Sequence, residues 1–188
     1  MGRDKGLLPH PDGGTWLERT LLLLAQLEAP ITLLSRHPAH LALAHSLQPI
    51  SITALAEPAP WEGPLLALHR LMQHHPEERL LLCPVDMPQL SFAALETLLA
   101  AAAMEPGAIH LAHDGQRLQP LLGLYPSSAA VRTQLAAAVG QGERRLQGWL
   151  AAWPWRPVAL DPRAIRNVNR PETAQPADSL HPRPGRQP

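Results

Sequence analysis

Asp86 is the first residue whose type and position could support chemistry. It follows a short apolar run at residues 79–83 and stands between Pro84 and Pro88, which stiffen the turn. A carboxylate held at the end of a buried strand is well placed to ligate Mg²⁺, a hard cation that takes oxygen ligands and keeps phosphate partners. The alternative interpretation is that Asp86 only caps the turn or helix that follows.

Lys5 lies in a short basic segment that Gly2 and Gly6 bracket at the start of the chain. A glycine-flanked backbone can approach an anion closely, and an ammonium group supplies a point charge for phosphate. The alternative is an ordinary solvated terminus.

Two polar pairs near the C-terminal end are further candidates. If the segment around Asn167 and Asn169 is extended, both amides point to one face and can hydrogen-bond the edge of a planar heterocycle. An Asx-turn before a terminal helix would explain the same pair. Arg144 and Arg145 open an expected helix, where their guanidinium groups could bind a phosphate, although a charged first turn on a solvated face is the simpler explanation.

Composition narrows the class of protein. The 188 residues are 45% apolar, and 16 basic residues balance 16 acidic ones, so we expect neither a nucleic-acid footprint nor a polybasic membrane anchor. No apolar stretch reaches the roughly 20 residues that span a bilayer. The single cysteine, Cys83, excludes an internal disulfide and fits a reducing compartment; inside an apolar strand its thiol should be inert. These features predict a cytoplasmic protein.

The elements that must position these residues alternate between short apolar runs and helical segments. This order predicts an α/β fold whose strands pair in parallel through right-handed crossovers, with the site beyond the carboxyl ends of the strands, in the loops after Ser35, Ile52 and Cys83. Asp114-Gly115 between two apolar runs predicts a β-hairpin. Strands are expected at residues 31–35, 49–52, 79–83, 108–112, 120–125 and 157–160, and helices at 15–29, 37–46, 65–75, 91–103, 127–139 and 143–152.

Taken together, five stretches resemble the molybdenum cofactor guanylyltransferase (MobA) family of nucleotidyltransferases. They occur in the family's order and at about its spacing, which indicates one such domain over residues 1–175; the Pro-rich, polar residues 176–188 are expected to form a disordered tail. The matching stretches are Met1-Gly2-Arg3-Asp4-Lys5-Gly6-Leu7-Leu8, Gly63-Pro64-Leu65, Pro84-Val85-Asp86-Met87-Pro88, Gly142-Glu143-Arg144-Arg145 with Trp149-Leu150, and Asn167-Val168-Asn169-Arg170-Pro171-Glu172.

The resemblance implies a Rossmann-like three-layer sandwich with a mostly parallel sheet, and transfer of GMP from GTP to molybdopterin carrying molybdenum, with Mg²⁺ and loss of pyrophosphate. Molybdoenzymes or other cofactor-biosynthesis proteins would be further partners, with no nucleic acid and no membrane. By the same resemblance, Lys5, Gly63, Pro64 and Asp86 would bind the nucleotide, Asp86 would hold Mg²⁺, and Asn167, Asn169, Arg144 and Arg145 would bind the pterin.

The sequence also departs from the family. The family's first strand, ending in Leu-Ala-Gly-Gly, and its glycine-rich loop precede the motif with which this chain begins, so the sheet is expected to lack that strand. The family's guanine-side asparagine falls on Ser35, and its aspartate falls on Ala56, beside Glu57. Either the start codon is assigned too late or the short form is a true remnant. The alternatives in function are an impaired homologue that binds cofactor or a partner, and a related transferase using CTP or a sugar phosphate.

Overall fold

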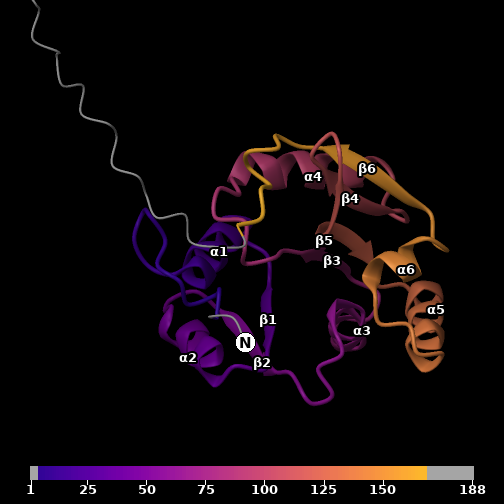
Figure 1. Ribbon diagram of the computed structural model, residues 1–188, viewed down its shortest axis with the longest axis horizontal. Helices are drawn as coiled ribbons and strands as arrows, with labels where there is room; N and C mark the ends of the chain where they lie inside the picture. Colours follow the sequence, from indigo (N-terminus) through magenta and orange to yellow (C-terminus); the bar gives the residue numbers. More distant parts are fainter. Residues whose placement is uncertain (1–3, 169–188) are drawn as a thin grey trace, which may run out of the picture.

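The computed structural model describes residues 4–168, in which helices and strands alternate along the chain (Figure 1). No helix among these residues is both long enough and apolar enough to cross a bilayer. In chain order the elements are α1 (Trp16–Ala25), β1 (Ile31–Ser35), α2 (Pro38–Ser46), β2 (Ile52–Ala56), α3 (Pro64–His74), β3 (Arg79–Leu82), α4 (Phe92–Met104), β4 (Ile109–His113), β5 (Leu118–Pro126), α5 (Ala129–Gly140), α6 (Leu146–Leu150) and β6 (Trp155–Ala159).

The strands form two sheets. Strands β1 and β2 pair in parallel, from Ile31 opposite Ile52 to Ser35 opposite Ala56. The second sheet has the order β3-β5-β4-β6, in which β5 is antiparallel to β3 and β4 while β4 is parallel to β6. Only β5 therefore runs against its sheet, which confirms the predicted mostly parallel α/β fold, and β4 and β5 form the hairpin predicted from Asp114-Gly115.

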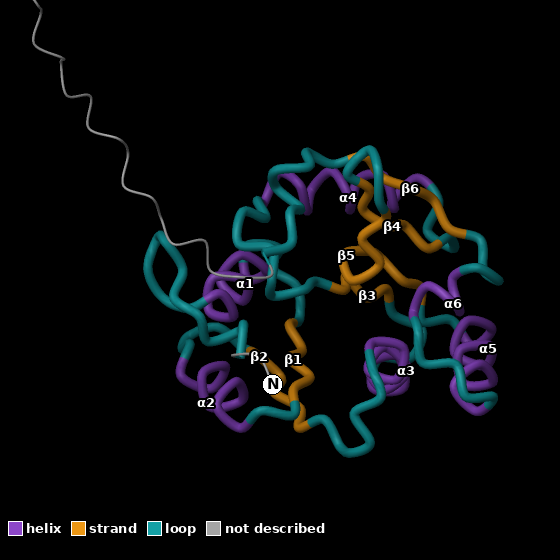
Figure 2. Tube along the Cα trace, in the orientation of Figure 1, coloured by secondary structure: helices purple, strands orange, loops and turns teal. Residues whose placement is uncertain are grey.

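Within the described residues, β1 and β3 each have a ladder partner on one edge only (Figure 2). Their side chains are correspondingly less covered: the three central residues of β1 and the last three of β3 are only partly buried, whereas the first four of β4 are fully buried. Strands of a parallel sheet are normally covered on both faces. The boundary between β1 and β3 is thus a seam at which the backbone ladder is interrupted.

Helices cover both faces of the four-stranded sheet, which gives the predicted three layers. Apolar side chains of α3, α5 and α6 pack against one face, around Leu65, Ile109 and Tyr125, and those of α4 pack against the other, around Leu98 and Leu122. A third cluster joins α1 and α2 to the β1–β2 pair. Helix α1 spans the seam, because its residue Leu24 packs against both the α4 cluster and the β1–β2 cluster.

Local sequence signals explain where several elements begin. Thr15 accepts the Glu18 backbone N–H and Glu18 accepts the Thr15 N–H, so the predicted capping box is present. Ser91 caps α4, as predicted, with its side chain accepting the Ala94 N–H, and Pro64 occupies the first turn of α3.

Two predicted starts are wrong by three residues each, and the first helix ends at Ala25, before the expected residue 29. The strand expected at residues 49–52 is β2 at Ile52–Ala56, because residues 47–50 form a turn closed by the Ile50 N–H and the Leu47 carbonyl. The helix expected to open at Glu143 begins at Leu146, because the Glu143 carboxylate accepts the N–H groups of Arg144 and Arg145 before the helix starts.

We predict that backbone amides of β4 and β5 exchange with solvent deuterium far more slowly than those of β1. Strands β4 and β5 each lie between two neighbouring strands, whereas β1 has one neighbour and is open at the seam. Less of the structure must therefore unfold to expose the β1 amides to solvent. Hydrogen exchange resolved by residue measures this. Equal protection of β1 and β4 would show that the edge of β1 is covered in solution and would contradict the seam.

Candidate active site

Lys5 and Asp86, 81 positions apart in the chain, meet at the seam. The Lys5 Nζ lies 3.2 Å from a carboxylate oxygen of Asp86, and their side chains are 36% and 26% exposed. Lys5 lies in the loop before α1, and Asp86 lies in the loop after β3, as predicted. An ion pair this exposed contributes only about 0–1 kcal/mol to folding. Its significance is therefore the juxtaposition of an ammonium and a carboxylate that solvent can reach.

The segment that carries the asparagine pair also reaches Asp86. The Val168 N–H donates to the backbone carbonyl of Asp86 at 3.0 Å. The neighbouring Asn167 donates its side-chain amide to the Gln119 Oε1 on β5, also at 3.0 Å. Asn169 lies outside the described residues, so only the first of the two predicted pterin-side amides is located, and its segment is anchored directly to the Asp86 loop.

A cavity of about 350 Å³ opens next to the Asp86 turn, between the β1–β2 pair and α3. The loops after β1, β2 and β3 all contribute to it, but the second of them follows Ala56 and not Ile52 as expected, because Ile52 begins β2. Val85, next to Asp86, forms part of its wall. Its lining residues are Leu17, Leu33, Leu34, Ser35, Arg36, His37, His40, Glu57, Trp61, Gly63, Ala67 and Val85.

Charged and aromatic side chains order the rim of this smaller cavity. Glu57 forms an ion pair with Arg70 of α3 at 2.9 Å, and both side chains are mostly buried. The exposed Trp61 donates its indole N–H to the Glu57 carbonyl, and the Arg36 guanidinium lies 5.4 Å from the Trp61 ring centroid. Sequence reasoning missed Trp61 and Arg70, since neither stands in a motif and only the fold brings them to the loops.

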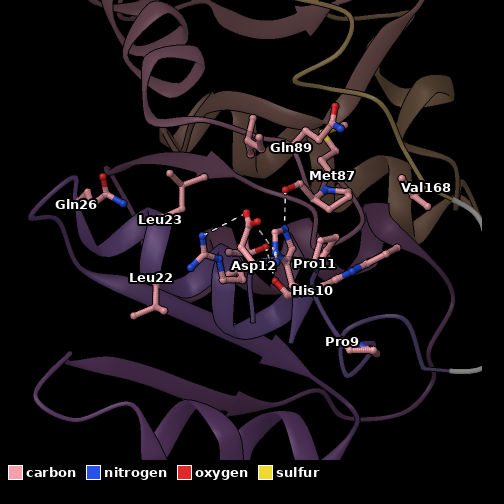
Figure 3. Close-up of a pocket in the computed structure, with 15 residues that line it drawn as sticks. Pro9, His10, Pro11, Asp12, Leu22, Leu23, Gln26, Met87, Gln89 and Val168 are labelled. Carbon is pink, nitrogen blue, oxygen red and sulfur yellow. Dashed lines mark hydrogen bonds and ion pairs between the residues drawn. The ribbon is translucent and has the colours of Figure 1, made fainter. Parts of the chain in front are cut away.

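A larger cavity of about 670 Å³ lies on the other side of the Asp86 loop, between α1 and residues 87–90 (Figure 3). His10 reaches across its floor to the Pro88 carbonyl, with its Nε2 2.9 Å away. The guanidinium of Arg19 lies 3.8 Å from the Asp12 carboxylate. Met87 and Val168 also line this cavity. Val85 lines one cavity and Met87 the other, so the turn that carries Asp86 contributes to both, while the Asp86 side chain itself lines neither.

Gly63 and Pro64 lie at the start of α3, where Gly63 forms part of the smaller cavity. Gly63 has φ of +104°, a backbone conformation that favours glycine. The backbone oxygen of Arg144 lies 3.4 Å from the position that a Cβ at Gly63 would take. The predicted nucleotide-side glycine and one of the two predicted arginines are therefore neighbours.

Arg144 and Arg145 have different surroundings. Arg144 donates to the Glu62 carboxylate and to the Val139 carbonyl, while the side chain of Arg145 is largely exposed. The backbone N–H groups of Arg145 and Arg144 lower the pKa of the Glu143 carboxyl. Among residues 4–168, Arg144 binds next to Gly63 and Asn167 binds Gln119, so no hydrogen bond joins these two predicted pterin ligands.

The donor set suits a hard cation only in part. Residues 4–168 contain no group of three or more His, Cys, Asp or Glu side chains that could hold a metal ion. Asp86 supplies one accessible carboxylate, and Mg²⁺ is commonly bound by one or two carboxylates together with substrate phosphates and water. Asp86 therefore fits a metal that arrives with a phosphate ligand and does not fit a permanently bound structural ion.

Comparison with known proteins agrees with this architecture. Residues 1–157 match the model of the MobA-like NTP transferase domain. A protein of Rhodopirellula baltica named "Probable molybdenum cofactor guanylyltransferase" is 35% identical over 95% of this chain and 86% of its own length.

Solved structures share the fold at low sequence identity. Molybdopterin-guanine dinucleotide biosynthesis protein A from Archaeoglobus fulgidus superposes with a TM-score of 0.65 at 16% identity, covering 90% of this chain and 86% of that one. The 2-C-methyl-D-erythritol 4-phosphate cytidylyltransferase from Thermus thermophilus gives 0.66 at 18%, covering 90% and 89%. These two likenesses establish the fold alone.

Fold and family together define the chain as a nucleotidyltransferase. It belongs to the MobA-like NTP transferase family, whose match covers most of the chain, and its curated relatives carry the name molybdenum cofactor guanylyltransferase.

Cys83 lies just after the end of β3 and not inside the strand as expected, and it is only partly exposed. We predict that it reacts slowly in the folded protein although it lies three residues from Asp86. Burial raises the pKa of its thiol to about 12. Since the thiolate is the reactive form, alkylation by iodoacetamide at pH 8 should be on the order of a thousandfold slower than for an unfolded chain. Mass spectrometry of the chain, which has one cysteine, measures this directly. Rapid labelling without denaturant would show that the Cys83 loop is open.

Proposed function

We propose that this protein transfers GMP from GTP to molybdopterin carrying molybdenum, forming molybdopterin guanine dinucleotide and pyrophosphate, with Mg²⁺. The observation that carries the proposal is the approach of Lys5 to Asp86, on a turn whose residues Val85 and Met87 line two different cavities. A nucleotidyl transfer joins two substrates at one phosphorus atom, so it needs two binding spaces that meet at a group able to neutralise phosphate charge. The family membership and the names of the relatives indicate which nucleotidyl transfer to propose.

In this proposal GTP occupies the smaller cavity. Its phosphates lie toward Lys5, whose ammonium neutralises their charge. The guanine base lies toward the rim, where Trp61 offers an aromatic face and Glu57 a carboxylate that can accept from the base N1–H and 2-amino groups. Glu57 stands beside Ala56, where the family's aspartate falls, and Arg70 holds it in place. These features support a guanine nucleotide despite Ser35 and Ala56.

Molybdopterin then occupies the larger cavity, on the Met87 and Val168 side. Asn167 borders this side through its neighbour Val168, which supports the pterin-side assignment of the asparagine segment. The terminal phosphate oxygen of molybdopterin attacks the α-phosphorus of GTP. A new P–O bond forms as the bond to the β-phosphate oxygen breaks, and pyrophosphate leaves with the electron pair. The chain positions both phosphates and stabilises their charge, which is most of what such a transfer requires.

Asp86 would hold the Mg²⁺ ion through its carboxylate. When bound, the ion neutralises the charge of the nucleotide phosphates. In the absence of nucleotide the carboxylate pairs with Lys5, so both groups lie where the phosphates arrive in this proposal. The backbone oxygen of Arg144 lies near Gly63, on the nucleotide side of this arrangement, and the assignment of Arg144 and Arg145 to the pterin rests on the family resemblance alone.

The reaction is tested by incubating the protein with GTP, Mg²⁺ and molybdenum-loaded molybdopterin and measuring pyrophosphate. We predict that Asp86→Asn lowers turnover by at least about a hundredfold, because the ligand for the cation loses its charge. Asp161→Asn, which changes an exposed aspartate on the loop after β6, is the matched control and should turn over normally. Undiminished turnover by Asp86→Asn would remove Asp86 from the mechanism, and no product from the folded wild-type protein would refute the proposal.

Nucleotide choice is tested separately by titrating the protein with GTP and CTP in the presence of Mg²⁺. We predict that Glu57→Gln weakens GTP binding by about tenfold to a hundredfold, since a charged acceptor for guanine is lost, and leaves CTP binding unchanged. Glu62→Gln, at an exposed carboxylate in the same loop, controls for the loss of charge. Tighter binding of CTP than of GTP by the wild type would favour a cytidylyltransferase instead.

A further inference from the structure

Asp4, His40 and Ser35 form a hydrogen-bonded chain directly beside Lys5. The Nε2 of His40 lies 2.9 Å from the Asp4 carboxylate, and its Nδ1 lies 2.9 Å from the Ser35 Oγ. This hydrogen-bonded chain continues at both ends. The Gly6 N–H donates to the Asp4 carboxylate at 3.0 Å, and the His37 N–H donates to the Ser35 Oγ at 3.2 Å. One imidazole thus links the loop before α1 to the end of β1.

With a neutral imidazole, the donors and acceptors of this hydrogen-bonded chain fit in one order. The Asp4 carboxylate can only accept, so the hydrogen between it and His40 belongs to Nε2. Nδ1 then accepts the hydrogen of the Ser35 hydroxyl, and the Ser35 oxygen accepts from His37. Every polar atom of the ring is satisfied. Ser35 is 7% exposed, so this buried group connects the end of β1 to the loop before α1.

Packing confines the His40 ring as tightly as its hydrogen bonds do. His40 is 9% exposed, and a Cβ placed on Gly6 would lie 2.8 Å from its Nε2 and 3.0 Å from its Cε1. Only glycine lets the loop approach the ring this closely. The same loop is fastened to α1, since the Leu17 N–H donates to the Gly6 carbonyl at 2.9 Å. Lys5 therefore lies between two residues that His40 contacts.

We propose that His40 is the positioning residue of the active site: through Asp4 and Gly6 it fixes the loop that presents Lys5 to Asp86, and through Ser35 it ties that loop to the wall of the smaller cavity. This inference rests on the proposed function for the role of Lys5. Among the described residues the two sheets share no ladder here, so hydrogen bonds to α1 and to His40 hold the loop before α1. A preordered Lys5 loses less conformational freedom when phosphate binds, which raises affinity.

The first test needs no nucleotide. His40→Ala should speed hydrogen exchange of the Gly6 and Leu8 amides by about tenfold, because the acceptor Asp4 and the turn closed by the Lys5 carbonyl lose their support. His45→Ala, at an exposed histidine on the same helix, should leave both amides unchanged. His40→Gln, which keeps an N–H toward Asp4, should restore most of the protection and serves if the alanine variant does not fold. Unchanged exchange in a folded His40 variant would overturn the proposal.

The second test asks whether His40 acts through Lys5. In titrations with GTP and Mg²⁺, His40→Ala should weaken binding by about tenfold in the wild-type background and have no further effect when Lys5→Ala is present. Independent, additive losses would mean that His40 is structural only and would overturn its positioning role. Absence of GTP binding by the wild type would refute the proposed function, and the exchange of Gly6 and Leu8 would still decide the inference about His40.

Discussion

Helix α1 packs across the two sheets, and the rest of the structure depends on this contact. Leu24 of α1 joins the apolar cluster under α4 to the cluster around β1 and β2, while no ladder joins β1 to β3 in the described residues. Burial of apolar surface is strong but non-directional. It holds the two sheets together without fixing how their loops face each other, so that the relative placement of loops at the seam falls to a few polar contacts.

Three such polar contacts join elements across the seam. Lys5 reaches Asp86 from the loop before α1, Thr32 on β1 bonds His75 at the end of α3 at 2.9 Å, and Glu57 after β2 pairs with Arg70. The last two join the β1–β2 unit to α3, which packs on the larger sheet. Glu57 also lines the smaller cavity, so its ion pair with Arg70 couples the wall of that cavity to the packing of α3.

The two cavities offer one binding space for each of the two proposed substrates. A single turn after β3 places Val85 in the smaller cavity and Met87 in the larger one, and Asp86 lies between these two residues in the sequence. Pro84 and Pro88 restrict the backbone of this turn, so a stiff segment sets which of its residues faces which cavity. Preorganised charge between two binding spaces suits phosphoryl chemistry, in which positioning and neutralisation dominate over covalent participation.

Much of this protein follows from local sequence alone. The Thr15 capping box, the Ser91 cap and the Asp114-Gly115 hairpin all form as predicted, because each depends on residues within a few positions of one another. Lys5 and Asp86 could be selected as candidates for the same reason, from a glycine-flanked lysine and a carboxylate after an apolar run. The start of β2 and the start of α6 were misjudged where a turn and a carboxylate cap competed with the apolar pattern.

Tertiary structure alone decided the division into two sheets, the pairing of Glu57 with Arg70, and the chain from Asp4 through His40 to Ser35. None of these has a sequence signature, since nothing in the order of residues marks His40, among ten histidines, as the one that meets Asp4. Local patterns report the preferences of a segment for helix, strand or turn. Which distant side chains meet depends on how helices and sheets pack, and that is settled only when the whole core is assembled.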